Sequence, residues 1–223
     1  MLLSKAIKRE VIITPVENYD KLRKGLEAQK YDLALVHPAH VSLASLDTGK
    51  YQLVALTKGF TDYRARFLVA KNSNIKSLAD IKDKRIVMPE ADSVTAVIAR
   101  ATLRDAGVHT DNFGIKVVKY QDAVPFFVEN GFADVGIVGS AALAQEWQAK
   151  GGKVLFESKP VPVKHVIASS KMQQDEVEKI RSVLLGLDAS EPGKKVLMQI
   201  GQKGFTMGGE KLLSGYGKWL VGA

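Results

Sequence analysis

Cysteine is absent from the 223 residues of this sequence. Its absence excludes disulfide bonds, thiolate metal sites and cysteine nucleophiles together. It fits an oxidising compartment, where a stray thiol is a liability, but a cytosolic protein can also lack the residue. Long apolar runs are missing too: none reaches the roughly 18 residues of a membrane span, so we expect no segment that crosses a bilayer.

Glycine and proline are too few for a collagen-like or low-complexity chain, at 19 and 7 residues. Hydrophobic residues make up 46% and charged residues 25%, which is typical of a globular protein. A chain of this length folds into one or two domains.

Acidic residues are outnumbered, with 24 Asp and Glu against 32 Lys and Arg, and the net charge is +8. Such a charge attracts anions of any size. The densest basic clusters, at residues 5–9 and 82–85, are short and carry no interleaved aromatic residues. We therefore expect no nucleic-acid partner. The first residues lack a signal-peptide pattern, which leaves the localisation open.

Short β-branched or apolar segments alternate with segments of helical periodicity along the chain. This alternation predicts an α/β fold with largely parallel sheets. The predicted strands are 10–14, 32–36, 51–57, 65–70, 84–88, 115–118, 135–138, 154–156 and 163–169. The predicted helices are 19–26, 38–46, 94–101, 124–128, 141–150, 173–187 and 192–200. The run 32–36 is short and apolar, which is typical of a strand buried on both faces.

Two similar βαβ units occur in the sequence, at residues 16–39 and 118–141. Asp32 and Asp134 are equivalent in them, an offset of 134 − 32 = 102 residues. The repeat predicts two similar lobes, each with its own sheet. The alternative is that any two βαβ units look alike because buried strands share a composition.

Ligands of open α/β sheets bind beyond the carboxyl ends of the strands, which selects four loops here. If two lobes face each other, these loops line one cleft. Together with residues beside a predicted chain crossing, the loops supply the candidate ligand-binding residues, which are Ser93, Thr95, Asp92, His37, His40, Tyr63, Arg64, Tyr120, Gln121 and Ser140.

The segment 92–95 follows a predicted strand and opens a helix. The hydroxyls of Ser93 and Thr95, with the unpaired N–H groups of the first helical turn, predict an anion site. The alternative is ordinary helix capping by Asp92 or Ser93, and the two roles are compatible. The Asp92 carboxylate would repel an anion unless it caps the helix or binds an amino group.

The remaining candidates carry no catalytic pattern. His37 and His40 have no third ligand nearby in sequence, so we expect hydrogen bonding rather than a metal site. The Arg64 guanidinium suits an oxyanion or a surface position equally well, and Arg66 is expected at the surface. The sequence contains no nucleophile elbow, zinc-protease motif, P-loop or dinucleotide fingerprint. We expect no enzyme activity, no cofactor and no metal.

Three segments resemble the type II periplasmic solute-binding proteins, in the phosphate- and phosphonate-binding branch of the ABC transporter substrate-binding proteins. Residues 77–86, SLADIKDKRI, are similar to the family's "SLaDLkGKrV". Residues 31–38, YDLALVHP, are similar to "vDvawlGP", and residues 130–136, NGFADVG, to "nGeaDaga". The segments occur in the family's order, and the resemblance covers nearly the whole chain.

The resemblance implies a two-lobed α/β protein with a ligand cleft between the lobes. Lobe 1 would comprise residues 1–66 and 167–223, and lobe 2 residues 67–166. By closing its lobes, the protein would capture a small oxyanion such as phosphate or phosphonate. It would then deliver the anion to an ABC transporter permease, acting as a monomer in the periplasm or otherwise outside the cytoplasm. The alternative is a ligand-sensing domain of the same fold from a signalling or regulatory protein.

The sequence departs from the family pattern at several positions. The family's Ser-Thr-Ser at the start of the phosphonate-binding helix is Ser93, Val94 and Thr95 here, with one hydroxyl fewer. His37 replaces the glycine before the proline, and Gln121 stands where the family has a histidine. The family's first strand, which precedes the first helix, has no counterpart, so we expect that strand of lobe 1 to be missing.

Overall fold

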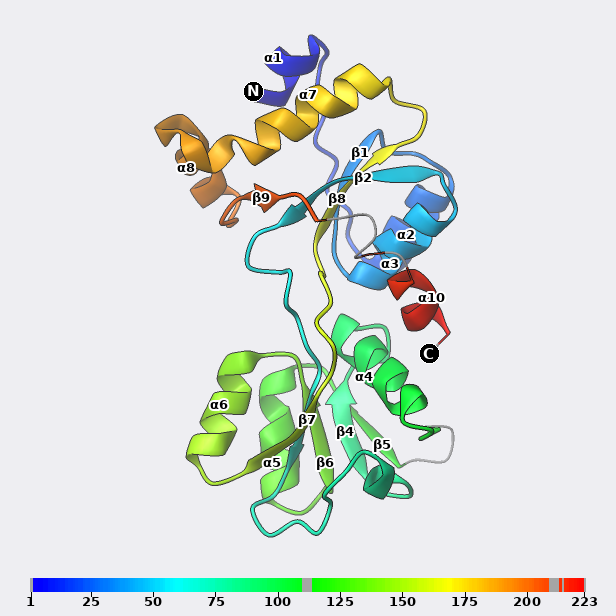
Figure 1. Ribbon diagram of the computed structural model, residues 1–223, viewed down its shortest axis with the longest axis vertical. Coiled ribbons are helices and arrows are strands. Elements are labelled where there is room, and N and C mark those ends of the chain that lie inside the picture. The colour runs from blue at the N-terminus through cyan, green and yellow to red at the C-terminus, as the bar shows by residue number, and fades with distance from the viewer. Residues whose placement is uncertain (1, 110–113, 209–212, 214, 223) are drawn as a thin grey trace. The chain divides into compact units, whose positions relative to one another are not determined.

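The computed structural model describes residues 2–109, 114–208, 213 and 215–222 (Figure 1). The chain forms two α/β units, each with its own sheet and hydrophobic core. Unit 1 comprises Met1–Asp62 and Val161–Lys218, and unit 2 comprises Tyr63–Pro160 and Trp219–Ala223. No helix among the described residues is long and apolar enough to span a bilayer.

The units differ from the predicted lobes at their boundaries. The chain leaves unit 1 after Asp62 and re-enters it at Val161, slightly before the predicted positions. The last residues were expected in lobe 1, but Trp219 lies in unit 2. Its indole Nε1 donates to Asp105 Oδ2 at 2.7 Å, and its carbonyl accepts from Arg104 Nη2 at 2.6 Å. These two bonds hold Trp219 on the last turn of a unit 2 helix.

The sheet of unit 1 has the strand order β1-β8-β2-β9. Every neighbouring pair in it is antiparallel, so the prediction of largely parallel sheets is wrong for this unit. The reason lies in the chain path: β2 runs toward the exit to unit 2, and β8 follows the return from it, so the two strands run in opposite directions. The strands are β1 (Leu33–Val36), β2 (Tyr51–Thr57), β8 (His165–Ser169) and β9 (Phe205–Thr206).

Helices cover this sheet, and the core beneath α7 and α8 includes Val54, Val166 and Ile180. The predicted cap of α2 is confirmed, because Asn18 Oδ1 accepts from the Lys21 N–H at 2.9 Å. The helices of unit 1 are α1 (Leu2–Ile7), α2 (Tyr19–Glu27), α3 (Ala39–Asp47), α7 (Gln174–Leu185), η3 (Leu187–Ala189) and α8 (Glu191–Gln199). Helix α10 (Tyr216–Val221) contains the boundary at Lys218.

Two strand predictions for unit 1 fail beside each other. Residues 10–14 form no strand, and Ile12 and Ile13 remain 77% and 80% exposed. The segment has the β-branched composition of a strand, but it pairs with none of the described strands. Strand β1 is not buried on both faces either, because it is the edge strand and Leu35 is 50% exposed.

The sheet of unit 2 has the order β5-β4-β6-β3-β7. The central strand β4 is parallel to β5 and β6, as predicted, whereas β3 is antiparallel to β6 and β7. As in unit 1, the two strands next to the chain crossings, here β3 and β7, pair antiparallel with each other. The strands are β3 (Arg66–Val69), β4 (Ile86–Pro89), β5 (Ile115–Val118), β6 (Val135–Val138) and β7 (Lys153–Glu157).

Three helices, α4, α5 and α6, pack on this sheet. Val87, Val124 and Trp147 belong to one core cluster of the unit. Pro125 lies in the first turn of its helix, where its missing N–H costs nothing. The helical elements are η1 (Ala79–Ile81), α4 (Val94–Asp105), η2 (Gln121–Ala123), α5 (Val124–Glu129) and α6 (Ala141–Ala149), with α10 at the C-terminal end.

Candidate ligand-binding site

The carboxyl ends of three parallel strands meet at one edge of the unit 2 sheet. Strands β5, β4 and β6 lie side by side in the same direction and end at Val118, Pro89 and Val138. The next helical elements along the chain are η2, α4 and α6. Since a helix presents unpaired N–H groups at its N-terminus, this edge collects hydrogen-bond donors.

The start of α4 is capped by Ser93, not by Asp92. Ser93 Oγ accepts from the Ala96 N–H at 3.2 Å, which leaves the hydroxyl proton of Ser93 to donate elsewhere. The N–H groups of the same first turn point to this end of the helix. Asp92 is exposed beside Arg100, whose Nη2 donates to the Ala91 carbonyl at 2.7 Å and holds the loop.

A partly buried pair of hydroxyl groups adjoins this helix end. Tyr63 Oη and Thr95 Oγ1 lie 2.7 Å apart, and Thr95 is 4% exposed. Both pack on Gly139, where a Cβ atom would lie 1.7 Å from Tyr63 Oη and 2.7 Å from Thr95 Oγ1. Only a glycine therefore allows the β6–α6 loop to approach so closely. Burial raises the pKa of Tyr63, so its phenol stays protonated and able to donate.

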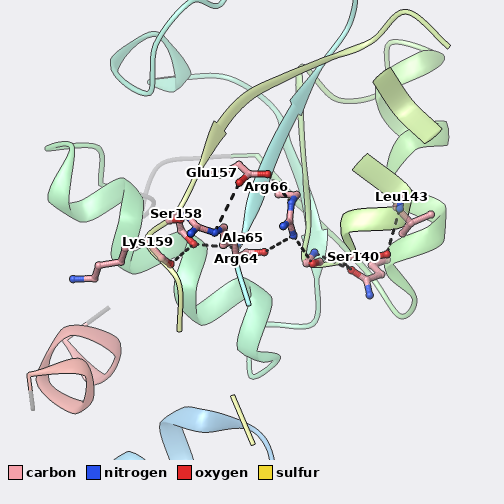
Figure 2. A network of polar contacts seen from close by, with 10 residues as sticks. Arg64, Ala65, Arg66, Ser140, Leu143, Glu157, Ser158 and Lys159 are labelled. Carbon is pink, nitrogen blue, oxygen red and sulfur yellow. Dashed lines mark hydrogen bonds and ion pairs between the residues drawn. The ribbon is translucent and has the colours of Figure 1, made fainter. Parts of the chain in front are cut away.

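The β6–α6 loop is fixed by side chains from two other elements. Gln121 Oε1 accepts from the N–H groups of Gly139 and Ser140, at 2.9 and 3.1 Å. Arg66 Nη1 donates to the Gly139 carbonyl at 2.8 Å. Ser140 Oγ in turn accepts from the Leu143 N–H at 3.3 Å and caps α6 (Figure 2). The loop is thus held from both sides of the strand that it follows.

The prediction of a surface position for Arg66 is wrong. It was expected at the surface, yet its side chain is only 12% exposed and also donates to Glu157 Oε1 at 2.8 Å (Figure 2). The alternation of Arg66 with its apolar neighbours gave no sign of this role. Its partner Gly139 lies 73 residues further along the chain, so only the folded sheet brings the two together.

Arg64 is held in the same network. Its Nη1 donates to the Ser158 carbonyl at 3.1 Å, and its Nε lies 4.0 Å from Glu157 Oε2. Figure 2 shows Arg64 and Arg66 on either side of the strand entry, with Glu157 between them. The structure therefore gives Arg64 a role in joining β3 to β7, and its role in ligand binding stays a prediction.

The two histidines among the predicted site residues, His37 and His40, belong to unit 1. His37 follows β1, and its Nδ1 lies 3.0 Å from the Val163 carbonyl, so Nδ1–H is the donor. Burial lowers the pKa of His37, and nearby Lys164 lowers it further, against the Val163 hydrogen bond. The ring is therefore a neutral group near pH 7. His40 is the second residue of α3 and is half-buried.

Tyr120 and Gln121 were predicted together, but the structure separates their roles. Tyr120 is 65% exposed, and Lys119 Nζ lies 5.3 Å from the centroid of its ring. Of the two residues, Gln121 is the one that accepts hydrogen bonds from the β6–α6 loop. Among the described residues, no three His, Asp or Glu side chains are grouped so that they could hold a metal ion.

Two compact sheets, joined by two chain crossings, and a donor-rich helix end beside one sheet define a two-lobed solute-binding protein of the type II periplasmic class. The chain belongs to the family described as ABC transporter, phosphonate, periplasmic substrate-binding protein, which matches residues 2–210. It is thus the solute-binding component of an ABC transporter and not an enzyme, and it acts outside the cytoplasm with a permease. This supports the transport role over the sensing alternative.

Solved structures confirm the fold. XAC2383 from Xanthomonas citri, bound to ATP, has a TM-score of 0.77 and 16% identity over 99% of this chain and 89% of that one. PhnD1 from Prochlorococcus marinus, in complex with methylphosphonate, has a TM-score of 0.68 and 21% identity over 97% and 87%. PA3383 from Pseudomonas aeruginosa, a binding component of an ABC phosphonate transporter, has a TM-score of 0.63 and 18% identity over 95% and 74%. No curated protein matches the sequence.

Proposed function

We propose that this chain captures a small tetrahedral oxyanion, such as phosphate or a phosphonate, at the N-terminus of α4. The observation that carries the proposal is the meeting of Ser93, the Tyr63–Thr95 hydroxyl pair and the Gly139–Ser140 loop at one sheet edge. Tetrahedral oxyanions need several donors from different directions and no proton acceptor nearby. A helix N-terminus with hydroxyl groups beside it meets that need.

The residues of this cluster have different roles in the proposal. Ser93 is partly exposed and its proton is free to donate, so its hydroxyl meets the anion together with the first N–H groups of α4. Thr95 is buried, and a hydroxyl that accepts from Tyr63 can still donate its own proton. Thr95 therefore donates its hydroxyl proton to the anion from the buried side of the site. Gln121 and Arg66 hold the β6–α6 loop in position beside it.

The known ligands of similar proteins support the same chemistry. PhnD1 holds methylphosphonate and XAC2383 holds ATP, and both compounds present tetrahedral phosphorus with charged oxygen atoms. The net charge of +8 favours the approach of any such anion. The family match supports the phosphonate class, and the missing hydroxyl at Val94 favours a ligand that needs fewer donors on this side.

Removal of the two hydroxyls tests the proposal. Isothermal titration with inorganic phosphate and with methylphosphonate should show that Ser93→Ala with Thr95→Ala weakens binding by roughly one to four decades. Each hydroxyl bond to a charged ligand contributes about 1.5–3 kcal/mol, and the pair is not additive. Ser190→Ala is the matched control, because Ser190 Oγ caps α8 in unit 1 by accepting from the Gly193 N–H at 3.2 Å.

The control separates binding from capping. Both variants lose a helix cap, so both should unfold at lower urea concentration. Only the Ser93 and Thr95 variant should lose affinity per folded molecule. Equal affinity in the parent and in that variant would place the anion elsewhere, with the loop that contains His37 and His40 as the next candidate.

A further inference from the structure

The side-chain amide of Gln121 is left with donors alone for a ligand. Its Oε1 accepts from the N–H groups of Gly139 and Ser140, at 2.9 and 3.1 Å, which fills both lone pairs of that oxygen. The same two contacts fix which end of the amide is the oxygen, because the nitrogen cannot accept there. The two N–H bonds of Nε2 therefore remain, and the hydrogen bonds among the described residues do not use them.

This amide lies at the strand end from which the chain enters α4. Gln121 follows β5, yet it binds the first residues after β6, and β4 lies between these two strands. The side chain therefore extends across the carboxyl end of β4. Its partner Gly139 also adjoins α4, because a Cβ atom there would lie 2.7 Å from Thr95 Oγ1. The donors of Gln121 and the start of α4 thus belong to one site.

The two hydroxyl groups at the start of α4 are arranged in the same way. Ser93 Oγ accepts from the Ala96 N–H at 3.2 Å. Thr95 Oγ1 lies 2.7 Å from Tyr63 Oη, and the Tyr63 phenol stays protonated because burial raises its pKa. When Thr95 donates to a ligand, Tyr63 is therefore the donor to Thr95. Each hydroxyl accepts from the protein and keeps its own proton for the ligand.

The backbone of the first turn of α4 adds further donors. Ser93 takes the Ala96 N–H with its hydroxyl and the Val97 N–H with its carbonyl, at 3.2 and 3.0 Å. The N–H groups of Val94 and Thr95 precede these two and are left for a ligand. Amide, hydroxyl and backbone groups at this site therefore all offer protons to whatever binds.

We propose that this site selects an oxyanion whose bound oxygen atoms carry no proton, so that sulfonates and fully ionised phosphonates form its ligand class. The inference rests on the proposed function, because it concerns the same anion site. A P–OH group placed here would direct its proton at other protons. The carboxylates nearest in sequence, Glu90 and Asp92, are exposed. A sulfonate has three unprotonated oxygen atoms at ordinary pH, whereas a phosphonate has them only after its second ionisation.

Two monoanions of similar shape test the proposal at one pH. At about pH 5, methanesulfonate is ionised and has three unprotonated oxygen atoms, whereas methylphosphonate carries the same charge and one P–OH group. Isothermal titration of the full chain should give methanesulfonate an affinity at least about tenfold higher, because the P–OH proton faces donors and finds no acceptor. The equal charge of the two compounds removes the general attraction of the net charge from the comparison.

Two variants should reduce this preference several-fold. Tyr63→Phe keeps the ring but removes the proton that Thr95 Oγ1 accepts, so Thr95 can accept from a P–OH group instead. Gln121→Glu replaces the Nε2 donors with a second oxygen, which can also accept from P–OH. Tyr51→Phe is the matched control, because Tyr51 Oη donates to the Tyr31 carbonyl at 3.0 Å within unit 1. Its ratio of the two affinities should equal that of the parent.

The other outcomes separate this inference from the proposed function. Equal affinity of the parent for the two monoanions, or tighter binding of methylphosphonate, would overturn the inference alone. A ratio unchanged in both Tyr63→Phe and Gln121→Glu would overturn it too, as would methanesulfonate failing to bind where methylphosphonate binds, at about pH 5 or pH 7.5. If methanesulfonate, methylphosphonate and phosphate all fail to bind at both pH values, the proposed function fails and this inference with it.

Discussion

At the scale of single residues, Gly139 is the most constrained position of the candidate site. A Cβ atom there would lie 1.7 Å from Tyr63 Oη. Gly139→Ala should therefore destabilise the fold by about 1–3 kcal/mol and weaken anion binding, because the loop or the tyrosine must move. Urea unfolding and phosphate titration measure the two effects.

Two further variants show whether the effect of Gly139→Ala comes from the contact with Tyr63. Gly114→Ala is the matched control, because the nearest atom to a Cβ there is 4.0 Å away, so its effect should stay within about 0.5 kcal/mol. Tyr63→Phe in the Gly139→Ala background removes the closest clashing atom and should restore part of the stability. Wild-type stability in Gly139→Ala would show that the loop approaches less closely than described.

His165 should make the stability depend on pH. Burial lowers its pKa from 6.5 to about 4, although its Nε2 is 3.0 Å from the Pro162 carbonyl. Between these values the unfolded chain binds a proton that the folded chain does not. Above pH 6.5 the neutral ring thus contributes about 3 kcal/mol to the free energy of unfolding. This contribution is lost as the pH falls toward 4.

Urea unfolding at several pH values checks this prediction. His165→Asn should be less stable than the parent at pH 7.5, and the difference should shrink as the pH falls toward 4. The exposed His109 supplies the control, since His109→Gln should keep the parent's pH dependence. A difference between His165→Asn and the parent that is constant with pH would contradict the assignment.

At the scale of elements, Gln121 allows charge and loop position to be tested separately. Gln121→Glu keeps an oxygen that can accept from Gly139 and Ser140, but it places a negative charge next to the proposed anion site. Its stability should stay within about 0.5 kcal/mol of the parent, while phosphate affinity should fall about tenfold or more. Calorimetric titration and urea unfolding measure these quantities.

Gln121→Leu gives the opposite pattern. It leaves two backbone N–H groups of the β6–α6 loop without their acceptor, so the free energy of unfolding should fall by about 1–3 kcal/mol. Unchanged phosphate affinity in Gln121→Glu, together with normal folding, would remove the β6–α6 loop from the proposed site.

At the scale of the whole molecule, the net charge of +8 should act on the rate of capture. Stopped-flow measurements should show that association with phosphate slows several-fold between about 0.02 and 0.5 M NaCl, because salt screens the long-range field. Sucrose at equal osmolality is the control and should not reproduce the loss. An association rate independent of salt would mean that local donors alone govern capture.

The sequence by itself determined most of the elements and the edge where the candidate site forms. The spacing of Tyr19, Leu22 and Leu26 after Asn18 predicted α2 and its cap, since helix periodicity and capping depend on neighbours within a few residues. The order of strand, turn and hydroxyl residues likewise predicted the start of α4. These signals depend on residues close together in sequence, so they can be recognised without knowledge of the fold.

Only the tertiary structure decided which distant groups meet. It made the unit 1 sheet antiparallel and paired residues 10–14 with none of the described strands, because strand pairing depends on the path of the whole chain. It also buried His165 and drew Arg66 to the Gly139 carbonyl. A side chain's burial and its long-range partners depend on packing between elements far apart in sequence, which no local pattern encodes.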